Sequence, residues 1–139
     1  MIELDNRTSI DVNEPLLLKI TNSLTNREIE LIITTDSEIR EINAASRGID
    51  KATDVLSFPY EDMPMSPLGS IVIAEGFVNE KANSLGHTPQ DEMTLLYIHG
   101  LLHLLGYDHE VDNGEMREKE ASLIAEFHLP TSLIVRTEG

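Results

Sequence analysis

Residues 88–106 read TPQDEMTLLYIHGLLHLLG, and this stretch decides the fold. Thr88 followed by Pro89 is a strong helix start, because an N-cap residue precedes a proline at the first helical position. From Leu95 to Leu105 the segment is apolar on nearly every side, which is typical of a helix enclosed by the rest of the protein. We therefore expect a central buried helix that ends where Gly106 caps it.

Shorter patterns on both sides of this helix predict strands alternating with further helices. Capping residues, glycine stops and apolar spacing predict helices over Glu14–Leu24, Asp36–Ser46, Gly76–Leu85 and Glu115–Phe127. Short β-rich runs predict strands over Glu28–Thr34, Asp54–Phe58 and Gly69–Ala74, with a proline-rich loop over Pro59–Leu68. This order indicates an α/β or α+β fold in one domain spanning residues 1–139, with helices packed on a sheet.

The composition excludes several classes of protein. The chain has 139 residues, 40% of them hydrophobic, which suits a folded domain rather than a disordered acidic tail. It lacks cysteine, which excludes disulfides and thiolate metal sites. Its start has no secretory signal pattern and no apolar run could span a bilayer, so we expect a cytoplasmic protein without a membrane partner. A net charge of −15 argues against a general nucleic-acid coat, and no DNA partner is expected.

Three of the five histidines lie within eleven residues of the central helix and its exit. His99 and His103 are four residues apart, so their rings share one helix face. Gly106 allows the chain to turn back, which would bring His109 toward the same face. Three converging imidazoles with one open coordination position form the catalytic arrangement of zinc rather than the closed structural one.

The alternative to a metal site is a pair of satisfied polar side chains. An i,i+4 histidine pair alone is as readily an accident as a ligand pair. Here, however, the pair lies in an apolar buried helix, where imidazoles without partners would cost free energy. We therefore favour one Zn²⁺ per chain, held by His99, His103 and His109, although nickel, copper or iron would also suit three imidazoles.

The spacing of these histidines equals that of the metzincin proteases, H-E-x-x-H-x-x-G-x-x-H. The glutamate of that motif, which acts as general base, is replaced here by Gly100. The three histidines of the motif are present but its general base is not. The sequence therefore indicates a substrate other than a peptide, or a general base from another part of the chain.

Read as a whole, His99–His109 resembles the signature of the YbeY family, bacterial metal-dependent endoribonucleases of ribosomal RNA maturation. Asn43–Pro59, NAASRGIDKATDVLSFP, resembles the family's N-x-x-x-R segment followed by T-D/N-V-L-S-F-P. Leu68–Ile73 resembles its L-G-D-I-x-I strand. Met116 and Glu120 stand where the family has a methionine and a glutamate after the third histidine.

The resemblance implies a mixed four-stranded sheet packed with helices, with the zinc helix at the centre. It implies zinc-dependent cleavage of single-stranded RNA, maturation of the 3′ end of the small-subunit ribosomal RNA, and ribosome quality control. Ribosomal proteins and a ribosome-associated GTPase would be partners. His99, His103 and His109 take the ligand roles and Arg47 the catalytic role. Ser70 departs from the family's aspartate, which removes any carboxylate bond from that position to a histidine.

The other candidates have ordinary alternatives. A guanidinium suits a phosphodiester under attack, yet Arg47 would also merely offset the dipole at a helix end. Asp108 either orients a histidine or is a turn residue, and we expect His87 and His128 on the surface. Two further functions stay open: a metal hydrolase of another substrate class, and a non-catalytic ribosome-assembly factor with a structural metal.

Overall fold

The computed structural model describes the chain except residues 62, 64–65, 108–113 and 130–139. His109 and Asp108 therefore lie outside the described residues. The described helices are α1 (Glu14–Leu24), α2 (Asp36–Arg47), α3 (Glu75–Leu85), α4 (Pro89–Leu104) and α5 (Glu115–Glu126). The described strands are β1 (Ile2–Asn6), β2 (Ile29–Thr34), β3 (Val55–Pro59) and β4 (Gly69–Ala74).

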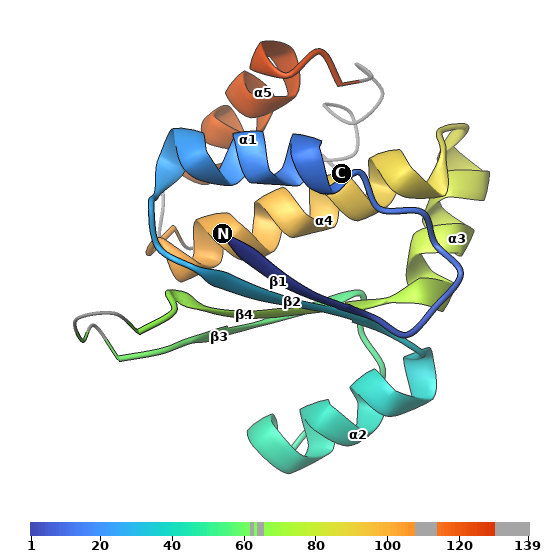
Figure 1. The fold of residues 1–139 in the computed structure, drawn as a ribbon. Helices are drawn as coiled ribbons and strands as arrows, with labels where there is room; N and C mark the ends of the chain where they lie inside the picture. Colours follow the sequence, from blue (N-terminus) through green and yellow to red (C-terminus); the bar gives the residue numbers. More distant parts are fainter. Residues whose placement is uncertain (62, 64–65, 108–113, 130–139) are drawn as a thin grey trace.

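The four strands form one mixed sheet in the order β1-β2-β4-β3. β1 pairs with β2 and β2 with β4 in parallel, while β3 runs antiparallel to β4 at the edge. Helix α4 lies along one face of the sheet, with α1 and α5 beyond it, and α2 covers the other face (Figure 1). The predicted mixed four-stranded sheet with helical cover and a central helix is confirmed. Among the described helices, none is both long and apolar enough to cross a bilayer.

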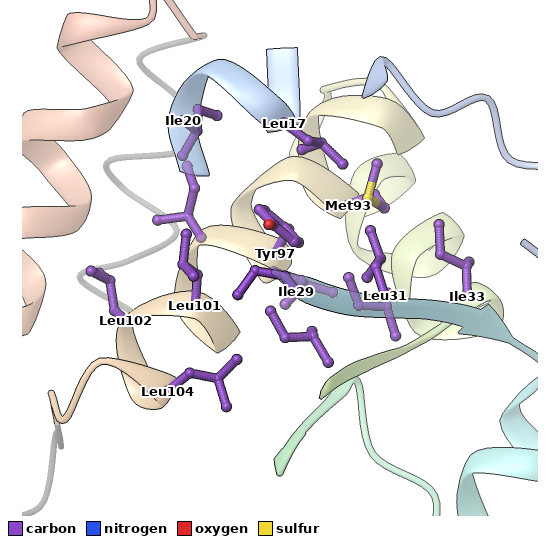
Figure 2. Packing of buried hydrophobic residues seen from close by; sticks show 14 of the residues in the cluster. Leu17, Ile20, Ile29, Leu31, Ile33, Met93, Tyr97, Leu101, Leu102 and Leu104 are labelled. Atoms are coloured by element: carbon purple, nitrogen blue, oxygen red, sulfur yellow. The ribbon is translucent and has the colours of Figure 1, made fainter. Parts of the chain in front are cut away.

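The main core lies between the sheet and α4, with α1 closing it from above (Figure 2). Leu31 and Ile29 point from β2 toward Tyr97 and Leu101 of α4, and Leu17 of α1 packs on the far side of that helix. Each of these five side chains is fully buried. Burying one such apolar side chain contributes about 1.5–3 kcal/mol, so this layer supplies most of the driving force for folding.

Capping contacts confirm two of the predicted helix starts and one predicted glycine stop. Thr35 accepts a hydrogen bond from the Glu38 amide, and Thr88 accepts one from the Asp91 amide. Gly48 follows α2 in the left-handed region, at φ 70°. Helix α2 ends at Arg47, one residue beyond the predicted boundary.

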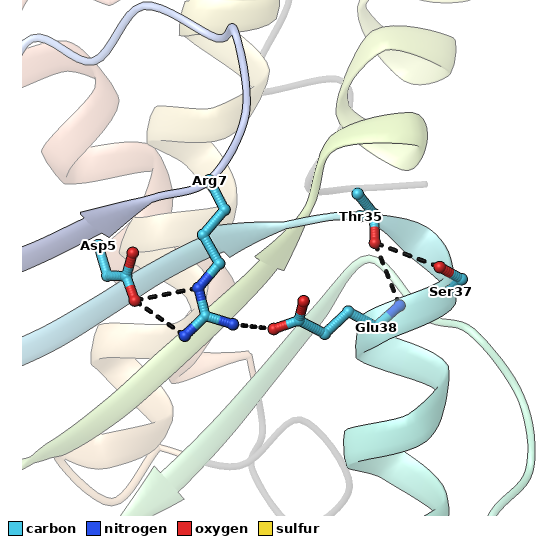
Figure 3. A network of polar contacts seen from close by, with 5 residues as sticks. All are labelled: Asp5, Arg7, Thr35, Ser37 and Glu38. Atoms are coloured by element: carbon cyan, nitrogen blue, oxygen red, sulfur yellow. Dashed lines mark hydrogen bonds and ion pairs between the residues drawn. The ribbon is translucent and has the colours of Figure 1, made fainter.

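Strand β1 was not predicted, because only two apolar residues alternate with acidic ones in its five positions. The strand forms through pairing with β2, and a polar network follows it (Figure 3). Arg7 donates two hydrogen bonds to Asp5, at 2.9 and 3.0 Å, and a third to Glu38 at the start of α2. The Arg7 amide also donates to the Ile33 carbonyl of β2, at 2.8 Å.

Gly100 sets the distance between α4 and the sheet. A Cβ atom at this position would lie 2.9 Å from Cγ2 of Ile71 and 3.1 Å from Oγ of Ser57. The Ser57 hydroxyl donates to the Gly100 carbonyl at 3.3 Å, so the helix backbone rests directly on β3 and β4. Any side chain here would push the helix and its histidines away from the sheet.

We predict that Gly100→Ala destabilises the fold. Alanine in a helix interior is ordinarily about 0.8–1.0 kcal/mol more favourable than glycine. Here overpacking outweighs that gain, with a net loss of about 1–3 kcal/mol expected from overpacked cores. Urea unfolding followed by circular dichroism measures the change, and a more stable variant would contradict the close approach.

Tyr97 allows a second test of the core through pH. The Thr21 hydroxyl donates to the Leu17 carbonyl at 2.7 Å, so the Tyr97 hydroxyl, 2.6 Å from Thr21 Oγ1, is the donor between them. Burial raises the pKa of Tyr97 to about 12. The folded state thus favours the neutral phenol, and its contribution to stability is complete below the unfolded pKa of about 10.

We predict that Tyr97→Phe lowers the free energy of unfolding by about 1 kcal/mol near neutral pH, through loss of one hydrogen bond. As the pH rises from about 10 toward 12, the parent loses stability that the variant keeps, so the difference between them shrinks. Urea titrations of both proteins at a neutral and an alkaline pH measure this. A constant difference would show that the phenol also ionises in the folded state.

Candidate metal centre and cleft

Two of the three predicted histidine ligands, His99 and His103, are described, and they lie one turn apart on α4. The ring centroids of His99 and His103 are 4.7 Å apart and the ring planes meet at 76°. Their Nε2 atoms lie 3.1 Å from each other. The i,i+4 spacing therefore brings together the same nitrogen of both rings.

This spacing fits two ligands of one metal ion. Two nitrogens bound at 2.0–2.1 Å to a tetrahedral zinc lie about 3.3–3.4 Å apart, close to the observed separation. The third predicted ligand, His109, is outside the described residues. Within the described ranges, no group of three His, Cys, Asp or Glu side chains is placed to hold an ion. The histidine pair is thus suited to bind a metal, and the complete ligand set stays a prediction.

Glu120 of α5 contacts the first of these histidines. Its Oε1 atom lies 2.8 Å from Nδ1 of His99, although the residue is only 2% exposed. No role was predicted for Glu120. The available signal was an acidic residue on the apolar face of the last predicted helix, in register with Met116, Leu123 and Ile124.

The histidine pair opens onto a cleft of about 270 Å³. The cleft is lined by Arg47, Val55, Ser57, Pro59, His99 and His103. Arg47 thus lines the same cleft as the histidines, although it belongs to the helix on the opposite face of the sheet. It is exposed and forms no hydrogen bond or ion pair with the described residues. The edge strand β3 separates α2 from α4 and provides three of the lining residues.

The position of Arg47 depends on the loop that follows α2. Asn43, which is 4% exposed, donates from its side chain to the Lys51 carbonyl at 2.9 Å. The Ile49 amide donates a hydrogen bond to the Asn43 carbonyl at 3.4 Å. Asn43 and Gly48 therefore act structurally in the N-x-x-x-R segment, by fixing the end of the helix that carries Arg47.

Other basic residues near the cleft do not join it. Arg40 forms two hydrogen bonds to Asp50, at 2.8 and 3.2 Å, and this bond holds the pKa of the Asp50 carboxyl below its ordinary value. Lys51 is exposed and is not among the lining residues. Arg47 is therefore the cation that lines the cleft in the described part of the chain.

Ser70 lies away from the histidines. Side chains alternate along β4, and Ile71 and Ile73 face α4 while Val72 and Ala74 face α2. Ser70 shares the α2 face with Val72, on the far side of the sheet from His99. An acidic residue at this position would not reach the histidines, so Ser70 removes no contact from the cleft.

The prediction that His87 lies on the surface is wrong. Its side chain is 2% exposed, and its Nε2 lies 2.9 Å from Oε1 of Glu92, whose side chain is fully buried. The reason is local: His87 follows the glycine that ends α3, and the turn directs it back onto the first turns of α4. His128 is exposed, as predicted.

Comparisons with known proteins agree with this architecture. The family model described as Endoribonuclease YbeY matches residues 5–128. The chain is 66% identical to Endoribonuclease YbeY of Sulfurimonas denitrificans over the whole length of both. It is 53% identical to that of Helicobacter pylori strain 26695 over 139 residues, 99% of each chain. The solution structure of TM1509 from Thermotoga maritima is similar at TM-score 0.64 and 30% identity, over 91% of this chain and 89% of that one.

The family model covers strands β2 to β4, the arginine segment and the histidine helix together, and the relatives match nearly from end to end. The chain therefore belongs to the endoribonuclease YbeY family.

Proposed function

We propose that the protein is a zinc-dependent endoribonuclease that cleaves single-stranded RNA, acting in maturation of the 3′ end of small-subunit ribosomal RNA and in ribosome quality control. Family membership supports RNA cleavage as the activity. The observation that carries the proposal is that one cleft is lined by the paired Nε2 atoms of His99 and His103 and by the guanidinium of Arg47.

The histidines would hold the metal. His99, His103 and the predicted third ligand His109 offer neutral imidazole nitrogens, which suit zinc and related divalent ions. When bound, the ion would supply Lewis-acid catalysis at the phosphodiester. The protein's contribution is a rigid ligand pair, because α4 is packed on the sheet through Gly100 and cannot shift without opening the core.

Arg47 would bind the phosphate that reacts. Cleavage of a phosphodiester increases the negative charge on its non-bridging oxygens, and a planar guanidinium donates two parallel hydrogen bonds to such oxygens. Since Arg47 is not paired with a carboxylate in the described chain, its donors are available to a substrate. Its position across β3 from the histidines would allow a phosphate to lie between the two groups.

The acidic surface favours a substrate presented by a partner. With a net charge of −15, the protein repels free RNA at long range, and the cleft contributes one arginine against this. We infer that ribosomal proteins or assembly factors bring the RNA to the cleft. Affinity for isolated RNA should accordingly be weak and fall further with salt.

We predict that the purified protein cleaves single-stranded RNA when loaded with zinc. Chelation and His103→Ala should each abolish cleavage, because either one removes the metal centre. The measurement is gel analysis of a labelled single-stranded RNA, with casein as a control substrate. Ribosome binding without cleavage of RNA would instead favour an assembly factor with a structural metal, and cleavage of casein would favour a hydrolase of another class.

We predict that Arg47→Lys lowers the rate of cleavage at saturating RNA by about 10-fold or more, since a lysine keeps the charge but loses the bidentate geometry. Arg40→Lys is the matched control, on the same helix but bonded to Asp50 outside the cleft. It should leave the rate unchanged. Equal rates for both variants would reduce Arg47 to a structural residue.

A further inference from the structure

We propose that Glu120 is a positioning residue, whose buried carboxylate orients His99 for metal binding through a hydrogen bond. The inference rests on the metal centre of the proposed function. It goes beyond that function by assigning a task to α5, which provides none of the residues lining the cleft.

Glu120 lies where a carboxylate is costly. Its neighbours on the inner face of α5 are Met116, Leu123 and Ile124, all buried and apolar. A carboxylate in such surroundings destabilises the fold unless hydrogen bonds compensate for its lost hydration. Its contact with Nδ1 of His99, at 2.8 Å, provides one such bond. A carboxylate that is costly to bury therefore lies at a position where it contacts a proposed metal ligand.

The contact selects which nitrogen of His99 faces the cleft. A carboxylate accepts hydrogen bonds, so Nδ1 of His99 carries the proton and donates it. The lone pair of the neutral ring is then on Nε2, the atom that lies 3.1 Å from Nε2 of His103. Glu120 thereby fixes both the tautomer and the ring orientation that a metal in the cleft requires, and a hydrogen-bonded carboxylate also makes the imidazole a stronger ligand.

A second buried pair in the same protein provides a control. His87 and Glu92 contact each other at 2.9 Å with side chains 2% and 0% exposed, while those of His99 and Glu120 are 28% and 2% exposed, so the two carboxylates are comparably buried. Neither His87 nor Glu92 lines the cleft. A substitution of Glu92 therefore reproduces the loss of a buried carboxylate without touching the proposed ligands.

The test compares Glu120→Leu, Glu120→Gln and Glu92→Leu in the full-length protein. Leucine fits the apolar face of α5, so the first variant should fold. Zinc affinity, measured by competition with a chelating dye, should fall about 10–100-fold in Glu120→Leu. It should be largely retained in Glu120→Gln, whose amide oxygen still accepts the Nδ1 proton, and in Glu92→Leu.

The second readout needs no metal. Nitrogen-15 NMR of the metal-free proteins should show the Nδ1-protonated tautomer of His99 in the parent and in Glu120→Gln, and a mixture in Glu120→Leu. Unchanged tautomer and affinity in Glu120→Leu would overturn the proposal and leave Glu120 a packing residue. Absence of zinc binding by the parent would instead count against the proposed metal centre, while the tautomer measurement would still decide the role of Glu120.

Discussion

The close packing of α4 on the sheet at Gly100 is the constraint on which the rest of the structure depends. With only a hydrogen atom between the helix backbone and the side chains of Ile71 and Ser57, the helix is held against both β3 and β4. Strand β3 is the edge strand of the sheet, so the turn of α4 that carries His99 and His103 borders the cleft beside β3. The cleft exists because the helix is close and the sheet ends there. The same contact explains the departure from the metzincin motif, since a glutamate at position 100 would have to occupy space that Ile71 and Ser57 already fill.

A buried helix that carries two imidazoles must satisfy them, and the surrounding elements do so. The Nε2 atoms of the two rings lie within hydrogen-bond distance of each other, and Nδ1 of His99 contacts the carboxylate of Glu120 in α5. Glu120 is the enclosed member of this set, at 2% exposure, and an enclosed polar group favours one arrangement because a misplaced partner costs its lost hydration. The His99 ring, 28% exposed, is therefore contacted at both nitrogens in the absence of an ion. Arg47 is the contrasting case: it is exposed, and its place is fixed through the backbone by Asn43 and Gly48 rather than through its own side chain.

Much of this arrangement could be predicted from the sequence, wherever local chemistry determines the outcome. Caps such as Thr35 and Thr88, and the glycine stops, define helices through contacts within a few residues. Strand β1 could not be predicted in this way, because Ile2 and Leu4 gain their burial from β2, which is far along the chain. The partners of buried polar residues were missed for the same reason. His87 and Glu92 are close in sequence but meet only because a turn folds them together, and Glu120 reaches His99 across two helices. Adjacency to His109 made Asp108 a candidate to orient a ligand, with a turn role weighed equally, and it lies outside the described residues, whereas the observed partner of His99 is 21 positions away.

The charge distribution disfavours nonspecific attraction of nucleic acid to this protein. Acidic residues outnumber basic ones by 25 to 10, and the basic Arg7, Arg40 and Arg27 are engaged with the protein's own oxygen atoms. Arg27 donates to the Ser66 and Pro67 carbonyls, where it supports the loop between β3 and β4. Each of these three guanidiniums thus has a structural task, whereas that of Arg47 has no such partner among the described residues. A protein with such a surface gains nothing from nonspecific attraction to nucleic acid. Under the proposed function, a phosphate would have to reach the cleft that Arg47 and the histidine pair line together, and such a site would favour a strand that a partner has already positioned.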